Sequence, residues 1–376
     1  MKVTAVKTIP VSVPAETAYK TSLSLASEAE HKFEHVLVQI ETDAGVTGLG
    51  ESAPLSSWPH GLSQGAVNSL IEETLAPVVE GRRLENIPRI IDDCWQALPG
   101  EPFPLCGIDM ALWDALGKAR DLPVYDLLGG PANERPSIDL HYTIGIKEPR
   151  KVRSDVKKAT DAGYSAIKIK VGGPDFAIER EAITAIAEAA PDTRIRIDAN
   201  QGWTVPEALR RIPILDDAAG GLVLVEQPID YDNIAGMARL RGSVSPPILA
   251  DEACFGPRSV ATLARADACD IVNVKLGKAG GFSRASDVAT VADAHGLPCF
   301  MGGMLELGVG AAANAHFAAS CPNITYPTGA LHVHATDTLV QEQAQWTPET
   351  GTFTVPDTAG LGVTLDRDAV AQYRVD

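Results

Sequence analysis

The sequence predicts an α/β protein in which a closed barrel of parallel strands follows a smaller α+β domain. The chain has 376 residues, enough for one barrel and one accessory domain. Its first part places strands before helices. From Ser137 onward, short apolar runs alternate with Ala-rich helical segments in seven or eight units, and a series of that length favours a closed barrel over an open sheet.

The N-terminal part is expected to form an α+β capping domain over residues 1–130. Residues 1–13 and 35–51 alternate apolar and polar side chains, as antiparallel strands do, and the second run contains a turn at Asp43–Gly45. Three later segments have the apolar spacing of helices. They cover residues 65–81, 87–98 and 106–130.

The barrel is expected over residues 131–340, with residues 341–376 as a segment of strand and turn that returns to the cap. Each barrel unit begins with a short apolar, β-rich run. These runs cover residues 137–146, 166–171, 194–200, 222–227, 248–253, 271–276, 299–304 and 324–329. A barrel places its reactive groups at the carboxyl ends of such strands.

Five polar positions follow one another at the ends of successive runs, each about one strand–helix repeat after the last. They are Lys170, Asp198, Glu226, Asp251 (beside Glu252) and Lys275. We therefore expect all five side chains to converge at one mouth of the barrel.

Three neighbouring carboxylates predict a divalent metal ion, because like charges in a confined site raise one another's pKa. Mg²⁺ prefers oxygen ligands of this kind, and no His or Cys stands at these strand ends to indicate zinc. The plainer interpretation is a structural ion pair, which is common for any single acid. Three acids after three successive strands favour the metal.

The lysines predict proton transfer. In "AIKIKVGG", Lys168 and Lys170 share one face of a strand. A second ammonium group beside Lys170 favours the neutral form that a base needs. Lys170 and Lys275 lie on opposed strands, as expected for removing a proton α to a carboxylate. A lone lysine pair in a strand is more often solvated, so its position relative to the acids carries the interpretation.

Composition limits the partners. The chain has 49 acidic and 32 basic residues, a net charge of −17, which repels nucleic acid. Its six cysteines form no CxxC pair, and its N-terminus lacks the apolar core of a signal peptide. No apolar stretch is long enough for a membrane span. We expect a soluble cytoplasmic protein that binds a small carboxylate.

Several motifs in this order resemble the enolase superfamily, specifically its muconate-lactonizing-enzyme subgroup. They are "GIDMALWDALGKARDLPVYDLLGG", "AIKIKVGG", "RIDANQGW", "LVEQPI", "ILADEA" and "NVKLGKAGG", and the resemblance covers nearly the whole chain. It implies a modified (β/α)7β barrel of the TIM type, with an N-terminal α+β capping domain completed by the C-terminal segment. It also implies a homo-oligomer.

The resemblance further implies roles for the residues at the strand ends. Mg²⁺ or Mn²⁺ would bind Asp198, Glu226 and Asp251. Lys170 and Lys275 would be the acid/base pair, with Lys168 as a supporting charge, and Asn200 and Glu252 would orient the ligands. Members form an enolate next to the substrate carboxylate and differ in the fate of that enolate.

Substrate contacts are expected from two cap loops and the last two strand ends. The candidates are Tyr19, His31, Trp58, Met304, Glu306 and Thr328. Glu306 resembles the glutamate that follows strand seven in cycloisomerases. Dipeptide epimerases have Asp-x-Asp at strand eight, where this chain has Thr328 and Ala330. We therefore favour a muconate-type cycloisomerase, with a racemase or epimerase of an amino-acid derivative, or a dehydratase, as alternatives.

Two different classes of protein compete with this prediction. A lysine at the end of strand six could form a Schiff base, as in aldolases, although that mechanism does not need three acids. A non-enzymatic scaffold is the other, although buried like charges are costly to keep without a use. His332 and His334 alternate on one face, but two such histidines without further ligands are more often packing residues than a zinc site.

Overall fold

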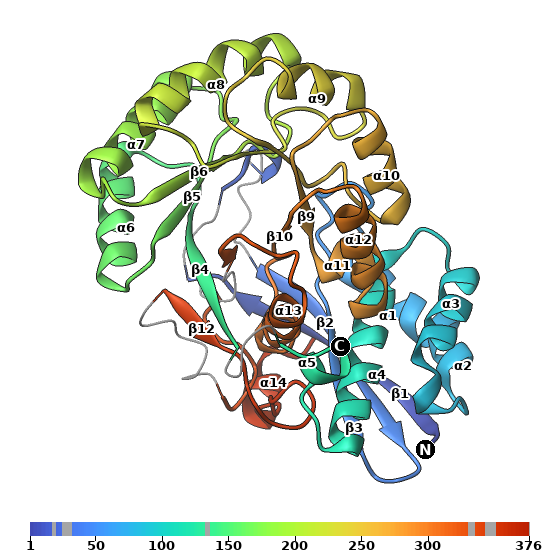
Figure 1. Cartoon of the computed structure of the whole chain (residues 1–376). Helices are drawn as coiled ribbons and strands as arrows, with labels where there is room; N and C mark the ends of the chain where they lie inside the picture. The colour runs from blue at the N-terminus through green and yellow to red at the C-terminus, as the bar shows by residue number, and fades with distance from the viewer. Residues whose placement is uncertain (17–19, 25–31, 132–135, 330–334, 343–350, 376) are drawn as a thin grey trace.

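The computed structural model describes residues 1–16, 20–24, 32–131, 136–329, 335–342 and 351–375. It has two sheets, a three-stranded antiparallel one and a parallel one that curves into a barrel (Figure 1). The predicted fold class is confirmed. The division at residues 130 and 340 stays a proposal.

The cap sheet has the order β1-β2-β3 and consists of β1 (Val3–Pro14), β2 (Lys32–Thr42) and β3 (Thr47–Ser52). Val36, Val38 and Ile40 are buried on one face of β2, and Phe33 and Leu37 are buried on the other, so both faces of the sheet are covered. Glycine is required at Gly50 in β3, because a Cβ there would collide with the carbonyl oxygen of Gly107. The sheet therefore lies in direct contact with the backbone of the following long helix.

The helices of the cap follow the predicted segments. They are α1 (Gln64–Leu70), a π-helical turn (Ile71–Leu75), α2 (Ala76–Val79), a 3₁₀ turn (Leu84–Asn86), α3 (Ile87–Ala97), α4 (Pro102–Arg120) and α5 (Val124–Leu127). Helix α4 is apolar on nearly every side, because it packs between the cap sheet and the barrel helices α11 and α12.

Eight parallel strands form the barrel in the order β10-β9-β8-β7-β6-β5-β4-β11. They are β4 (Ser137–Ile144), β5 (Ala166–Lys170), β6 (Arg194–Asp198), β7 (Val225–Glu226), β8 (Ile248–Ala250), β9 (Ile271–Val274), β10 (Cys299–Met301) and β11 (Thr328–Gly329). The amide of Cys299 donates to the carbonyl of Asn323 (2.9 Å), which brings β10 to the segment before β11. The barrel is thereby nearly closed.

Helices cover the outside of the strands, with α6 to α10 in an arc (Figure 1). They are α6 (Pro149–Asp161), α7 (Phe176–Ala189), α8 (Val205–Ala219), α9 (Ile234–Arg241), α10 (Pro257–Arg265), α11 (Leu276–Ala279), α12 (Phe282–Ala294) and α13 (Gly308–Ser320). Their buried faces are mostly Ala, Val, Ile and Leu, so they pack closely on the short strands.

The C-terminal segment returns to the cap, as predicted. It contains β12 (Thr352–Thr354), which pairs antiparallel with β4, and α14 (Arg367–Tyr373). The amide of Leu361 donates to Asp114 of α4 (2.7 Å), and the amide of Val375 donates to the carbonyl of Pro10 in β1 (3.0 Å).

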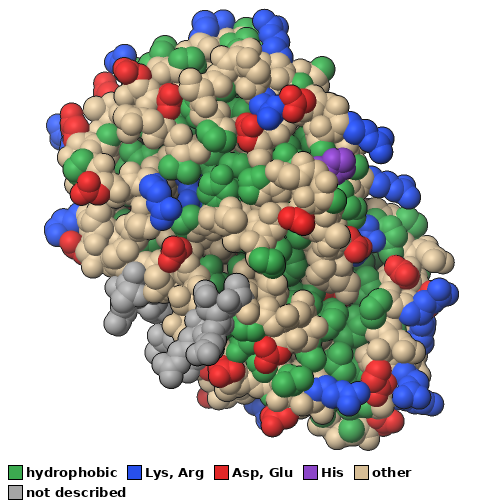
Figure 2. Space-filling model, viewed as in Figure 1, with side chains coloured by type: hydrophobic (Ala, Val, Ile, Leu, Met, Phe, Trp, Pro, Cys, Tyr) green, Lys and Arg blue, Asp and Glu red, His purple; other side chains and the backbone are tan. Residues whose placement is uncertain are grey.

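Acidic and basic side chains are interspersed over the face in Figure 2, and neither kind forms a continuous patch there. Within the described part of the chain, no helix combines the length and the apolar character needed to cross a membrane.

Replacing Asp114 with Ala is expected to destabilise the protein by about 3 kcal/mol. This buried carboxylate accepts the amides of Leu49 and Leu361 (both 2.7 Å) and binds Lys118 (2.6 Å), so its loss leaves buried donors unpaired. Urea unfolding measures the effect, with the exposed Asp161→Ala as the control. A loss equal to that of the control would contradict the prediction.

Asp109→Asn is expected to remove part of the pH dependence of stability. Burial raises the pKa of Asp109 from 3.8 to about 7, despite hydrogen bonds from Ser283. The folded protein holds this proton more tightly than the unfolded chain does. Its contribution to stability is therefore present below pH 3.8 and is lost as the pH rises through about 7.

Urea unfolding at pH 5 and pH 8 tests this expectation. The wild type should lose more stability between the two values than Asp109→Asn, because the amide cannot ionise. The exposed Asp161→Asn serves as the control, and an equal loss in all three proteins would contradict the expectation.

Candidate active site

Three buried carboxylates stand at the carboxyl ends of successive barrel strands. Asp198 ends β6, Glu226 ends β7 and Asp251 directly follows β8, and each is at most 1% exposed. The parallel register places Lys170 beside Asp198 and Asp198 beside Glu226. The structure therefore brings these predicted residues together at one mouth.

Burial and the neighbouring charges set the protonation of this trio. Burial and then the charge of Asp198 raise the pKa of Glu226 to about 7. Burial would also raise the pKa of Asp251, but Lys275 and Lys278 outweigh it and hold that pKa below its usual value. Lys170 and Lys168 likewise outweigh burial at Asp198 and lower its pKa. The trio thus depends on nearby positive charge.

The three predicted lysines supply that charge. Lys170 Nζ lies 2.5 Å from Asp198 Oδ2, and Lys275 Nζ lies 2.7 Å from Asp251 Oδ2. Lys168 Nζ lies 3.4 Å from Asp198 Oδ2 and 3.2 Å from Glu226 Oε2. All three are 5–7% exposed, so their ammonium groups are largely withdrawn from water.

Asn200 and Glu252, which the family resemblance implies as residues that orient the ligands, extend this network. Lys170 Nζ donates to Asn200 Oδ1 (2.7 Å), and Asn200 Nδ2 donates to Glu252 Oε1 (3.0 Å). Burial, followed by the charges of Asp251 and Asp198, raises the pKa of Glu252 to about 8. Asn200 therefore connects Lys170 to a carboxyl group that holds its proton near neutral pH.

Two residues of this network were not predicted from the sequence. Lys278 is 1% exposed and donates to Oδ1 (2.8 Å) and to the backbone carbonyl (2.6 Å) of Asp251. Asn273 Nδ2 donates to Glu226 Oε1 (2.9 Å). The sequence did carry a signal for both residues, namely their spacing from Lys275. Asn273 stands two positions before Lys275, in β9, and Lys278 stands three positions after it, in α11.

The cap contributes Trp58 and a docked turn to this end of the barrel. Lys275 Nζ lies 4.0 Å from the centroid of the Trp58 ring, close enough for a cation–π interaction. Ser22, in a 3₁₀ turn (Ser22–Ser24), donates to the carbonyls of Ala199 and Asn200 (2.7 and 2.8 Å). Tyr19 and His31 lie outside the described residues.

The candidates after strands seven and eight are all buried. Glu306 is 4% exposed, burial raises its pKa, and its Oε1 has no hydrogen-bond partner in the described structure. Thr328 is 3% exposed and its Oγ1 is likewise unpartnered there. Met304 is fully buried among cap side chains, so its contact with substrate stays a prediction. Ala330, His332 and His334 lie outside the described residues.

A buried contact between His35 and Glu51 lies where the cap meets the segment that carries Glu306. His35 Nδ1 lies 2.8 Å from Glu51 Oε1, and both side chains are at most 1% exposed. Glu51 also accepts the amides of Leu307 (2.7 Å) and Gly310 (2.8 Å) at the start of α13. A carboxylate at a helix N-terminus satisfies its free amides, so Glu51 fixes this loop beneath the cap.

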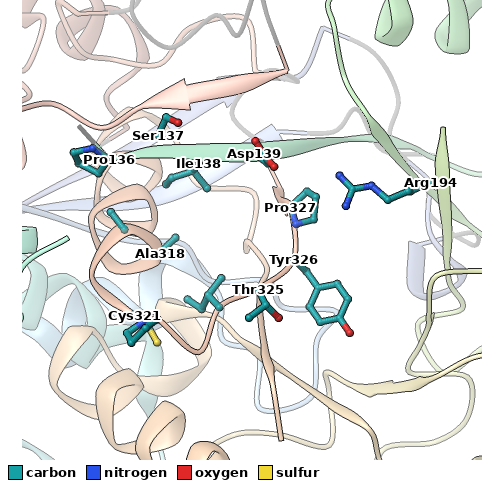
Figure 3. A pocket seen from close by; sticks show the side chains of 13 residues that line it. Pro136, Ser137, Ile138, Asp139, Arg194, Ala318, Cys321, Thr325, Tyr326 and Pro327 are labelled. Carbon is teal, nitrogen blue, oxygen red and sulfur yellow. The ribbon is translucent and has the colours of Figure 1, made fainter. Parts of the chain in front are cut away.

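A pocket of about 480 Å³ lies at the opposite end of the barrel strands (Figure 3). Ser137 and Arg194, at the starts of β4 and β6, line it together with Tyr326 and Pro327. It contains none of the predicted site residues. Because barrel chemistry belongs to the carboxyl ends of strands, we do not assign the reaction to this pocket.

The donor set at the mouth fits a hard divalent cation. It supplies only carboxylate oxygens, which Mg²⁺ and Mn²⁺ accept, and repulsion within the trio is what such a cation would relieve. Among the described residues, no three Asp, Glu, His or Cys side chains are arranged as a ready-made metal cage. The ammonium groups of Lys168, Lys170 and Lys275 lie against the three carboxylates.

Comparison with known proteins identifies the family. A family profile described as "Enolase C-terminal domain-like" matches residues 151–369, and one described as "Mandelate racemase / muconate lactonizing enzyme, N-terminal domain" matches residues 6–129. The chain belongs to the enolase superfamily. The resemblance seen in the sequence is confirmed, and the chain's curated relatives include isomerases of more than one kind, epimerases and cycloisomerases.

Three relatives illustrate that range. The chain is 35% identical to L-Ala-D/L-Glu epimerase of Bacillus subtilis over 86% of this chain and 87% of the relative. The crystal structure of 2-chloromuconate cycloisomerase from Rhodococcus opacus covers 100% of both chains at 29% identity, with a TM-score of 0.92. That of N-succinyl Arg/Lys racemase from Bacillus cereus covers 100% and 99% at 27% identity, with a TM-score of 0.93.

Lys278→Met is expected to lower Mn²⁺ affinity by about 10- to 100-fold. The change removes one of the two ammonium groups that hold Asp251 and leaves its backbone carbonyl without that donor. Titration with Mn²⁺ measures the affinity. The exposed Lys157→Met is the matched control, and equal affinities in the two variants would count against a role for Lys278.

Proposed function

We propose that this isomerase uses a divalent metal ion to move a proton on the carbon α to a substrate carboxylate, by way of an enolate. The observation that carries the proposal is the pair of buried lysines, Lys170 and Lys275, on β5 and directly after β9, with the carboxylate trio between them. This is the arrangement that removal and return of an α-proton requires.

Asp198, Glu226 and Asp251 would hold Mg²⁺ or Mn²⁺. The bound ion would draw negative charge from the substrate carboxylate and so acidify the α-carbon. Lys170 and Lys275 would remove or return the proton. Lys168 would keep positive charge beside Lys170, and Asn200 and Glu252 would fix the position of the Lys170 ammonium group. Burial of these groups strengthens each electrostatic interaction.

Racemisation or epimerisation of an N-blocked amino acid is the first candidate reaction. Two lysines of similar burial, each bound to a carboxylate of the trio, suit proton transfer at both faces of one carbon. Thr328 carries no charge with which to bind a free ammonium group, which favours a blocked nitrogen. One relative is named a racemase of an N-succinylated amino acid, and another an epimerase.

A muconate-type cycloisomerase, the reaction favoured by the sequence, is the second candidate. Glu306 supports it, because this buried carboxyl group follows strand seven and has one oxygen free of hydrogen bonds in the described structure. Several relatives are named muconate or chloromuconate cycloisomerases. In this reaction one lysine would transfer the proton and the other would act mainly by its charge.

Lys170→Met and Lys275→Met discriminate between the two reactions. In D₂O with Mg²⁺, a two-base racemase should lose exchange of the α-proton from one stereoisomer in each variant, by about 10³-fold, and retain it from the other. A cycloisomerase should turn over muconate, and should lose that turnover more severely in the variant that lacks the proton-carrying lysine than in the variant that lacks only a positive charge. Proton NMR of N-acyl amino acids, dipeptides and muconates measures exchange and turnover, and a wild type inactive on all of them would contradict the proposal.

Removing the metal ion should abolish the activity, and adding Mg²⁺ should restore it, because the trio needs a cation to bind the substrate carboxylate. Treatment with EDTA followed by dialysis into Mg²⁺ tests this. Borohydride in the presence of substrate is the companion measurement. Covalent trapping of Lys275, with activity unaffected by EDTA, would instead support a Schiff-base enzyme.

The remaining partners follow from charge and chemistry. A small carboxylate is the proposed substrate, and the net charge of −17 disfavours nucleic acid. We also propose a cytoplasmic location, since the six cysteines are unpaired, and a homo-oligomer, as the family resemblance implies.

A further inference from the structure

One aromatic ring lies in the middle of the barrel and has polar neighbours from three other strands. Phe300 of β10 is fully buried. The ring of His141 (β4) stacks on it at 5.6 Å, and Cζ of Arg196 (β6) lies 5.2 Å from its centroid. Lys168 Nζ (β5) lies 5.7 Å from the same centroid. The side chains of Arg196, Lys168 and His141 therefore all lie against the ring of Phe300.

Two of these neighbours also hold the eighth strand. Arg196 Nη1 donates to the carbonyl of Pro327 (3.1 Å), and His141 Nδ1 lies 3.0 Å from the same oxygen. Pro327 directly precedes Thr328 in β11. We call His141, Lys168, Arg196, Phe300 and Pro327 the Phe300 cluster. It joins β4, β5, β6 and β10 to the start of β11, below the carboxylate trio.

The energetics of Arg196 show why the ring matters. Arg196 is the largest fully buried side chain of the described structure, and no ion pair of that structure includes it. Its Nε and Nη2 also have no partner there. Glu226 attracts Arg196 without forming an ion pair with it, so the burial of this cation is only partly compensated, and the face of a desolvated aromatic ring offsets a further part of the cost. Phe300 therefore stabilises a buried cation in addition to packing against apolar side chains.

The same ring helps to fix Lys168. The register pairs Lys168 with Arg196 on the neighbouring strand, and both cations lie close to Phe300. Lys168 also contacts Asp198 and Glu226. A shift of Lys168 would alter the charge beside Lys170, two residues along the same strand face. Lys275 has different partners, Asp251 and Trp58.

We propose that Phe300 is a positioning residue for proton transfer: its ring holds Lys168 against Asp198 and Glu226, and so supports Lys170 but not Lys275. The prediction for catalysis rests on the function proposed above. Removing the ring should slow the reaction at the face of the substrate that Lys170 serves, while the face served by Lys275 keeps its rate.

Three variants test the proposal. Phe300→Leu removes the ring but keeps a large apolar side chain, and Phe300→Tyr keeps the ring. Phe317→Leu is the matched control, since Phe317 is 2% exposed and lies in α13 outside the cluster. Thermal unfolding of each variant gives the stability cost of the lost ring.

Exchange of the α-proton in D₂O, at saturating Mg²⁺, is measured for each stereoisomer. Phe300→Leu should slow exchange at the Lys170 face about tenfold and leave the Lys275 face within about twofold of wild type. Phe300→Tyr should restore the Lys170 face. The proposal is wrong if Phe300→Leu slows exchange of the α-proton equally at both faces. It is also wrong if Phe300→Leu slows exchange at neither face although it loses as much stability as Phe317→Leu.

Titration with Mn²⁺ needs no substrate and separates this proposal from the proposed function. A misplaced Lys168 should weaken Mn²⁺ binding about tenfold in Phe300→Leu, and not in Phe300→Tyr or Phe317→Leu. If that pattern holds while no substrate exchanges in the wild type, the positioning role stands and the proposed function fails. Unchanged Mn²⁺ affinity in Phe300→Leu would overturn the positioning role whatever the substrate.

Discussion

The burial of three carboxylates at one mouth of the barrel is the constraint on which the rest of the site depends. Asp198, Glu226 and Asp251 are shielded from water, and water is what normally stabilises ionised acids. Each must therefore be neutralised locally, by protonation, by an ammonium group or by a metal ion. Four lysines at this mouth follow from that requirement, and their positions also suit them to move protons.

The cap and the barrel form the site jointly. The barrel supplies the acids and lysines at its strand ends, and the cap supplies Trp58 over Lys275. Glu51 connects the two, because it pairs with His35 in the cap sheet and accepts backbone amides at the start of α13. The barrel thus supplies the reactive groups, while the cap, joined to it by a shared apolar core and by the polar contacts of Glu51, adds an aromatic ring to the site.

The sequence predicted the strands and the reactive residues because both repeat. Lys170, Asp198 and Glu226 each close an apolar run, so their convergence follows from the barrel alone. Lys278 and Asn273 also stand at a regular spacing from Lys275. They were missed because neither is the last polar residue of an apolar run. The bond between Glu51 and Leu307 joins positions 256 residues apart, and no local pattern in one sequence indicates such a contact. The same holds for the neighbours of Phe300, which lie on separate strands.

The hydrogen bond between Val375 and Pro10 has a consequence for how the cap folds. It joins β1 to a segment far along the chain, and the amide of Leu361 likewise binds Asp114 of α4. Contacts of such long sequence separation form late, because the entropy of closing a long loop must be overcome first. The cap is therefore expected to complete its folding together with the barrel and not as an independent unit.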